Sequence, residues 1–308
     1  MPGLNDELKR IHTMSALMAE LLTHGPVVTD GAWGTQLQAR GLGIGEFPDA
    51  WNLTHPDRVE EVARGYVEAG SRVILTNTFG ANRIRLAEQD ASLAGRVTEI
   101  NRCGVEISRR GAGARAKIFA SIGPTGKLLM SGDVTPDEMS AAFAEQAQAL
   151  AAAGADALVI ESMSDIEEAT LAVAAAKATG LPVVASMVYD SGQGHDRTMM
   201  GTTPESDAVA LAEAGADVVG ANCGRGIADF VAICHRMRAV TGLPLWMKAN
   251  AGLPELVQGR TVYRTTPAEF AQHLPALVEA GASFIGGCCG SSPEFIREVA
   301  ARLAKPGH

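Results

Sequence analysis

The chain lacks the basic surface that nucleic acids require. Its 26 lysine and arginine residues are outnumbered by 35 aspartate and glutamate residues, and the formal net charge is -9 at pH 7. No run of lysines or arginines interrupts this acidic balance. Because a nucleic-acid-binding protein needs a cationic patch, we exclude nucleic acid as a partner. A small molecule or another protein is favoured instead.

Long apolar runs are also missing. None approaches the ~18 residues of a membrane-spanning helix, and charged residues stand early, at 6–10, where a signal peptide would have its apolar core. We therefore expect no membrane association. Five cysteines, an odd number in a long chain, fit poorly with a disulfide framework. Reduced thiols predict a cytoplasmic protein.

A dinucleotide-binding signature is absent as well, because no G-x-G-x-x-G opens a helix after the first expected strand. No linker or change in composition divides the 308 residues, and 46% of them are hydrophobic. An α/β barrel fills such a length as one domain.

What the chain does contain is a repeating strand-then-helix unit. Apolar runs predict strands at 27–30, 72–77, 118–122, 157–161, 183–188, 217–221, 245–249 and 283–286. A hydroxyl residue, a proline and an acid introduce helices at 54–57, 135–138, 203–205, 266–269 and 292–294. Four helices are expected to end on Ala-Gly, at Gly70, Gly154, Gly215 and Gly281. The strands lack strict alternation, as parallel strands buried on both faces do. We predict the α/β class and a single (β/α)8 TIM barrel.

Residues 1–25 are expected to form an N-terminal helical extension that caps the bottom of this barrel. Its apolar face would be formed by Leu8, Ile11, Leu17, Leu21 and Leu22. Residues 26–308 would then form the barrel domain.

Three cysteines follow two of the expected strands. Cys223 stands in Asn222-Cys223-Gly224, and Cys288 and Cys289 stand in Gly286-Gly287-Cys288-Cys289-Gly290. Since the carboxyl ends of barrel strands meet at one face, these thiols can converge. Three thiolates would hold Zn²⁺ and leave one tetrahedral position for a substrate. By contrast, Cys103 and Cys234 lie in expected helices and are interpreted as small buried hydrophobes.

Such a ligand set favours one kind of chemistry. Two positive charges and three negative ones leave the centre with a net charge of −1, which makes the metal a poor Lewis acid for hydrolysis. It is suited to bind a fourth thiol, to remove its proton and to keep the sulfur nucleophilic. The residues therefore predict alkyl transfer to a thiol.

These motifs resemble those of the homocysteine S-methyltransferase family. The resemblance is carried, in the family's order, by Asp30-Gly31-Ala32-Trp33-Gly34-Thr35, Thr76-Asn77-Thr78-Phe79, Asn222-Cys223 and the Gly-Gly-Cys-Cys-Gly element. It implies a zinc-containing barrel that methylates homocysteine to methionine, an activity of methionine biosynthesis. The zinc ligands it implies are Cys223, Cys288 and Cys289.

The resemblance also implies further site residues. Asp30 and Gly31 are similar to a first-strand element beside the substrate amino acid. Glu161 resembles the acid that contacts the amino group of homocysteine, although it could be an ordinary barrel carboxylate. Asn250 resembles an asparagine that occupies the open zinc position in the cobalamin-dependent branch, although an Asn-Ala-Gly turn is the alternative.

Of the family's methyl donors, we expect a methylated corrinoid, and glycine betaine or a related onium compound and S-methylmethionine are the alternatives. Segments 76–82, 123–128 and 248–252 resemble the cobalamin-dependent branch. Because the chain stops at His308, we expect the corrinoid on a separate protein. An aromatic cluster of Trp33, Phe47 and Trp51 favours an onium donor instead, through cation–π attraction of up to ~2 kcal/mol, unless these rings pack under a loop.

Two further alternatives stay open. The chain could be a non-catalytic zinc-binding subunit of a methyltransferase complex. It could also methylate selenohomocysteine or another small thiol.

Overall fold

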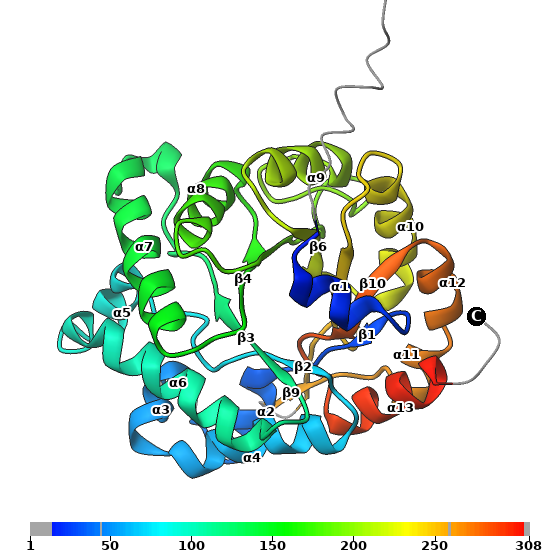
Figure 1. Ribbon diagram of the computed structural model, residues 1–308, viewed down its shortest axis with the longest axis horizontal. Helices are drawn as coiled ribbons and strands as arrows, with labels where there is room; N and C mark the ends of the chain where they lie inside the picture. The colour runs from blue at the N-terminus through cyan, green and yellow to red at the C-terminus, as the bar shows by residue number, and fades with distance from the viewer. Residues whose placement is uncertain (1–13, 44, 258–259, 305–308) are drawn as a thin grey trace, which may run out of the picture.

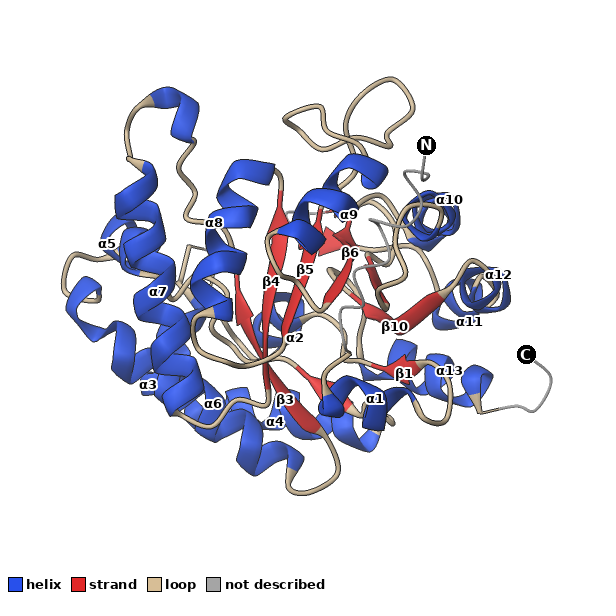
Figure 2. Ribbon diagram, turned by 45° about the horizontal axis from the view of Figure 1, so that its top comes forward, coloured by secondary structure: helices blue, strands red, loops and turns tan. Residues whose placement is uncertain are grey.

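The computed structural model describes residues 14–43, 45–257 and 260–304. Eight parallel strands form a nearly closed barrel in the order β1, β10, β7, β6, β5, β4, β3, β2, with helices around it (Figures 1 and 2). At the seam, the Arg72 amide donates to the Val28 carbonyl at 2.9 Å. The barrel strands are β1 (Val27–Val28), β2 (Val73–Ile74), β3 (Lys117–Ile122), β4 (Ala157–Met163), β5 (Val183–Met187), β6 (Val218–Cys223), β7 (Leu245–Ala249) and β10 (Ala282–Gly287). The predicted (β/α)8 barrel is confirmed.

The helices begin and end largely where the local sequence signals them. Thr135, Thr203 and Thr266 are N-caps whose hydroxyls accept a backbone N–H bond. At the first of the five expected starts, His55 is the N-cap and Thr54 ends the preceding helix, so that prediction was off by one residue. The four Ala-Gly glycines all have positive φ, the conformation that ends a helix.

The α-helices are α1 (Ala16–Leu22), α2 (Trp33–Ala39), α3 (Trp51–Thr54), α4 (Pro56–Glu68), α5 (Arg83–Gln89), α6 (Val97–Ala112), α7 (Pro136–Ala152), α8 (Ile166–Lys177), α9 (Pro204–Glu213), α10 (Ile227–Arg238), α11 (Pro267–Ala271), α12 (Leu274–Glu279) and α13 (Pro293–Leu303). Short 3₁₀ turns are η1 (Pro48–Ala50), η2 (Ala94–Arg96) and η3 (Leu129–Ser131). None of the helices in the described ranges is long and apolar enough to cross a membrane.

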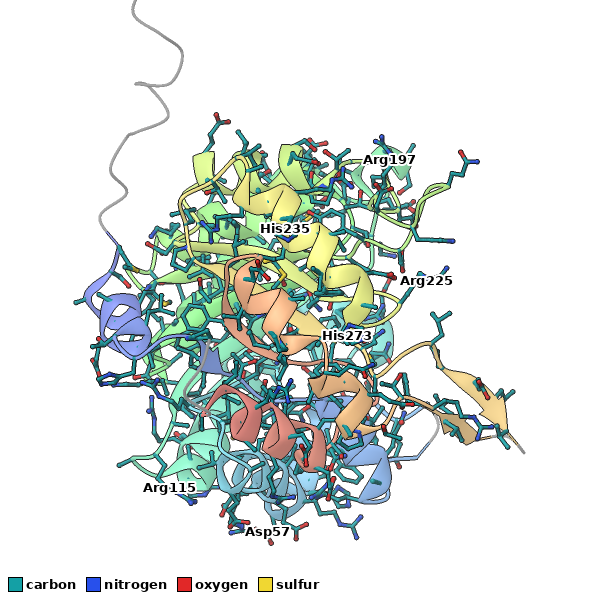
Figure 3. All side chains as sticks on the ribbon, turned by 90° about the vertical axis from the view of Figure 1, so that its right-hand side faces the viewer. Asp57, Arg115, Arg197, Arg225, His235 and His273 are labelled. Carbon is teal, nitrogen blue, oxygen red and sulfur yellow. The ribbon has the colours of Figure 1, made fainter. Side chains whose placement is uncertain are left out.

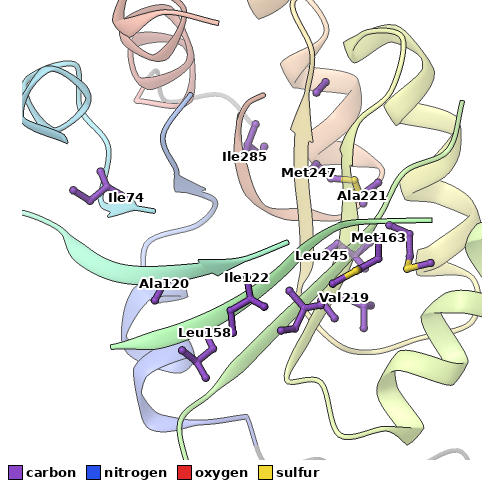
Figure 4. Packing of buried hydrophobic residues seen from close by; sticks show 14 of the residues in the cluster. Ile74, Ala120, Ile122, Leu158, Met163, Val219, Ala221, Leu245, Met247 and Ile285 are labelled. Carbon is purple, nitrogen blue, oxygen red and sulfur yellow. The ribbon is translucent and has the colours of Figure 1, made fainter. Parts of the chain in front are cut away.

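Each barrel strand is buried on both faces. Side chains such as Leu158, Val219 and Met247 point outward and pack under the helices (Figure 4). Their neighbours Val159, Val218 and Trp246 belong to a second cluster inside the barrel. This double burial explains why the strand sequences are apolar without alternation.

The lower end of the barrel is closed by α1, which crosses the barrel axis in Figure 1. Its Met18 and Leu21 are buried against the interior cluster that includes Val27, Phe119 and Trp246. Leu8 and Ile11 of the expected apolar face lie outside the described residues. The division of the chain at residue 25 stays a prediction.

One element of the barrel's upper face was not predicted from the sequence. The β7–α11 connection contains an antiparallel pair, β8 (Glu255–Val257) and β9 (Arg260–Val262). In Figure 3 this hairpin projects from the side of the molecule opposite α1. It therefore belongs to the face at which the barrel strands end.

Candidate active site

Three thiols meet at the carboxyl ends of β6 and β10. Cys223 is the last residue of β6, and Cys288 and Cys289 follow β10. Their sulfur atoms all lie within 4.8 Å of one another, and the Cys223 and Cys288 sulfurs are 3.0 Å apart. Within the described ranges this is the one group of potential metal-binding side chains. Cys234, in contrast, is buried in α10 with its sulfur 3.5 Å from the Ala280 carbonyl.

Strand β7 joins the two cysteine segments. Its end lies between β6 and β10, and the Cys288 amide donates to the Ala249 carbonyl at 2.7 Å. The Asn250 amide donates to the Cys223 carbonyl at 3.0 Å. Gly286 lets β1 approach, because a Cβ there would lie 2.0 Å from the Thr29 hydroxyl. The glycines of the motif therefore serve close packing behind the thiols.

The pKa values of the thiols in this cluster are shifted in opposite directions. Hydrogen bonds from Cys223 and Cys288 lower the pKa of Cys289. The bond to Cys288, the neighbouring Cys289 and burial raise the pKa of Cys223. Thiols so close cannot all ionise without a cation between them. The cluster is thus poised to hold one.

The donor set fits a tetrahedral metal ion such as zinc. A Zn–S distance of about 2.3 Å places tetrahedral thiolates about 3.8 Å apart, between the shortest sulfur contact and the outer limit of this cluster. Asn250 lies at the adjacent strand end, where its Nδ2 donates to the Gly224 carbonyl at 2.6 Å. Its Oδ1 is buried and has no hydrogen-bond partner among the described residues. A free oxygen therefore stands beside the thiol segments.

Glu161 is aimed by a bulge in β4. The register with β5 shifts between Ile160 and Met163, and Ser162 has a φ of +60°. The Glu161 carboxylate, 8% exposed, accepts a 2.5 Å bond from the Ser121 hydroxyl. Burial raises its pKa to about 7, although the charge of Lys248 acts in the opposite direction.

Asp30 is fully buried, and both of its oxygens have protein partners. Oδ2 accepts from the Trp33 indole and the Leu75 amide, each at 2.7 Å, while Oδ1 is paired with the ammonium of Lys248. Burial alone would lower the pKa of Lys248, but the charges of Asp30 and Glu161 raise it. Gly31 packs tightly, since a Cβ there would lie 2.8 Å from the Ser291 carbonyl and the Tyr66 ring.

Lys248 and Tyr263 lie at this site although neither was predicted from the sequence as a site residue. Lys248 is the one charged residue of β7, and a charge in an otherwise apolar strand was the available sequence signal. Tyr263 follows β9, and its ring covers Gly290, where a Cβ would lie 2.2 Å from the ring. Burial and the neighbouring thiols raise its pKa to about 12. No sequence signal connected Tyr263 with the cysteines.

The three rings of the expected aromatic cluster each contact different residues. Trp51 is buried, with the Arg58 guanidinium 5.5 Å from its ring centroid and the His55 ring at 4.5 Å. The Phe47 ring packs against Gly80. The half-buried Trp33 donates to Asp30, next to the site. Of the three, Trp33 alone is tied to a candidate site residue by a hydrogen bond.

Several large apolar side chains are exposed on loops that follow barrel strands. These loops follow β2, β3, β5 and β7, and parallel barrel strands deliver such loops to one face. The exposed side chains are Phe79, Met130, Met199, Met200, Leu253, Leu256 and Val257, which we call the apolar rim. Leu256 and Met130 are 79% and 76% exposed. These side chains come from four different loops on the face at which the barrel strands end.

Comparisons with known proteins agree with this architecture. A family model described as homocysteine S-methyltransferase matches residues 27–303. Methionine synthase of Mycobacterium tuberculosis is 31% identical over 95% of this chain, which spans 26% of that protein. Betaine–homocysteine S-methyltransferase 1 of Danio rerio is 30% identical over 92% of this chain and 75% of its own length. The metallated form of homocysteine methyltransferase MmuM from Escherichia coli, 24% identical, has the same fold, with a TM-score of 0.77 over 94% of this chain and 100% of that one.

Proposed function

The chain belongs to the homocysteine S-methyltransferase family, and on that basis we propose that it transfers a methyl group to the thiolate of homocysteine to give methionine. The observation that carries this proposal is the convergence of three thiols at the open end of the barrel, within 4.8 Å of one another. A carboxylate suited to an amino group, Glu161, belongs to a strand end of the same face.

We assign Cys223, Cys288 and Cys289 as the ligands of a zinc ion. We assign to Asn250, whose Oδ1 has no hydrogen-bond partner among the described residues, the role of occupying the remaining zinc position when no substrate is bound. Zinc, when bound, lowers the pKa of a thiol that joins the three cysteines, so that the thiol is deprotonated at neutral pH. All five cysteines are free, which fits the reducing cytoplasm that we propose as the compartment.

The chain's own residues bind and orient the acceptor. Glu161, in its carboxylate form, accepts hydrogen bonds from the ammonium of homocysteine. Asp30 and Gly31 form the wall of this pocket, and Asp30 holds Lys248 in place. The bulge at Ser162 fixes the direction of Glu161. By binding the ammonium, Glu161 orients the acceptor so that its sulfur lies in line with the donor methyl group.

For the donor, we propose a methylated corrinoid carried by a protein surface that docks on the apolar rim. A small, freely diffusing donor does not require exposed Met130 and Leu256, whereas a docking protein buries them. Betaine or S-methylmethionine is the second candidate, supported by Tyr263 beside the thiols and by the half-buried Trp33. The burial of Trp51 under Arg58 reduces the aromatic surface open to an onium donor.

The proposal is tested by methionine formation from homocysteine with zinc-loaded protein. Methylcobalamin, glycine betaine and S-methylmethionine are supplied side by side. We expect turnover with methylcobalamin; turnover with betaine or S-methylmethionine alone assigns the second candidate. If zinc is bound and no donor yields methionine, the proposal is contradicted: either the acceptor is another thiol or the chain has no catalytic role. A non-catalytic subunit would give that same silence and would also lose its fold when Cys289 is replaced.

A further inference from the structure

Asn222 connects the thiol cluster to the strand end that bears Glu161. It is the penultimate residue of β6 and is completely buried. Its Oδ1 accepts from the Ser162 amide at 2.8 Å and from the Ser186 hydroxyl at 2.7 Å. Its Nδ2 donates to the Ser162 hydroxyl at 2.6 Å. One amide side chain thus spans β4, β5 and β6.

The orientation of this amide is determined by its partners. A backbone N–H can only donate, so the atom that faces the Ser162 amide must be the oxygen. The nitrogen therefore faces the thiols, 3.6 Å from the Cys223 sulfur and 3.9 Å from the Cys288 sulfur. One of its two N–H groups is used by Ser162, and the other is directed at sulfur.

The two residues that Asn222 joins both have an unusual backbone. Ser162 and Cys223 have φ of +60° and +61°, and among the described residues His195 is the one other non-glycine with positive φ. Residues other than glycine keep a positive φ only where the surrounding structure enforces it. Asn222 is hydrogen-bonded to the backbone N–H and to the hydroxyl of Ser162, and it directly precedes Cys223. It is therefore placed to enforce the positive φ of both residues.

We infer that Asn222 is a positioning residue that holds the thiol cluster and the Glu161 bulge in a fixed relation and donates an N–H to the thiolate sulfurs. This inference rests on the proposed metal centre. Outer hydrogen-bond partners of metal ligands typically change metal affinity by about 10- to 100-fold when replaced. Asn222 therefore acts on the site without touching the acceptor or the donor.

Asn222→Asp is the most direct test. An aspartate keeps the shape and the oxygen that accepts from Ser162 and Ser186, but it replaces the N–H donor with an anion facing two sulfurs. We expect the zinc dissociation constant, measured by competition with a chelating dye, to rise about 10-fold or more. In the Co²⁺-substituted protein, the sulfur-to-cobalt charge-transfer band should shift, because the sulfurs have lost a hydrogen bond.

A second variant and a control complete the experiment. Ser162→Gly tolerates a positive φ and removes the hydroxyl that anchors the amide, so it should fold and move both readouts in the same direction. Ser108→Ala removes the buried 3.1 Å bond that the Ser108 hydroxyl of α6 donates to the Leu75 carbonyl after β2. This bond includes neither Asn222 nor a thiol, so the variant should move neither readout.

Wild-type zinc affinity and an unshifted cobalt spectrum in both site variants would overturn the inference. Methionine formation is measured in parallel on the wild type. A wild type that binds zinc but forms no methionine contradicts the proposed function alone, because the effect of Asn222 is read from metal binding. Failure of the wild type to bind zinc overturns both.

Discussion

The buried pair of Lys248 and Asp30 allows a quantitative prediction for Lys248→Met. Lys248 is 1% exposed and Asp30 is 0% exposed, so neither charge is solvated by water. Methionine has a similar length and no charge, and its substitution leaves Asp30 buried without a cation. Removal of one partner of a buried ion pair costs about 3–5 kcal/mol in free energy of unfolding.

The local contacts place this variant at the lower end of that range. Asp30 keeps its hydrogen bonds from the Trp33 indole and the Leu75 amide, each 2.7 Å long, and these partly stabilise the remaining charge. We therefore expect a loss of about 3 kcal/mol for Lys248→Met. The double variant with Asp30→Asn should regain part of this loss, because it no longer contains an unpaired charge.

The assay is guanidinium unfolding followed by circular dichroism at pH 7, with a chelator present so that bound metal does not contribute. Arg102→Met is the matched control, since it breaks the 2.8 Å surface pair with Glu106, whose side chains are about half exposed. That pair should be worth less than about 1 kcal/mol. If Lys248→Met unfolds like the control, or if the double variant loses the sum of the single losses, the buried pair does not have the assigned role.

Three further predictions concern the site and the pH dependence of stability. Cys289→Ala should lower bound zinc per chain and abolish turnover while thermal unfolding by circular dichroism still shows a folded barrel; a full zinc content would contradict the ligand assignment. Glu161→Gln should raise the KM for homocysteine about 10-fold or more while leaving zinc content unchanged, because the amide replaces a charged acceptor for the ammonium; an unchanged KM contradicts its role. Burial raises the pKa of Asp49 from 3.8 to about 7, so the folded state binds this proton more tightly than the unfolded state does. The stability of the wild type relative to Asp49→Asn should therefore fall by about 2–4 kcal/mol as the pH rises from about 4 to about 7. Above about pH 7 it should stay level. Parallel stability curves for the two proteins between pH 4 and pH 8 would show that Asp49 is not so perturbed.

The barrel and the meeting of the thiols could be predicted from the sequence. Runs such as 157–161 and 245–249 are apolar on both faces, and Thr-Pro-acid starts and Ala-Gly ends mark the helices between them. A repeated strand–helix unit of this kind closes as a barrel, and the strand ends then share one face. Cys223, Cys288 and Cys289 follow two such strands, so their convergence depends only on local pattern and fold class.

The environment of these thiols depended on the tertiary structure. Lys248 and Asp30 are 218 residues apart, and their pairing requires the register of β7 and the closure of the barrel at β1. The bulge at Ser162 is stabilised by Asn222 from another strand, and the sequence near residue 162 does not predict a bulge. Tyr263 reaches the thiols only because the β8–β9 hairpin lies on the upper face.

Local propensity and periodicity determine which segments become strands and helices, and a barrel needs little more. Which side chain meets which depends on strand register, bulges and loop paths, and these are decided by packing between segments distant along the chain. The sequence by itself therefore determined the scaffold and the three thiols. Only the folded chain decided the charges, hydrogen bonds and aromatic ring that surround them.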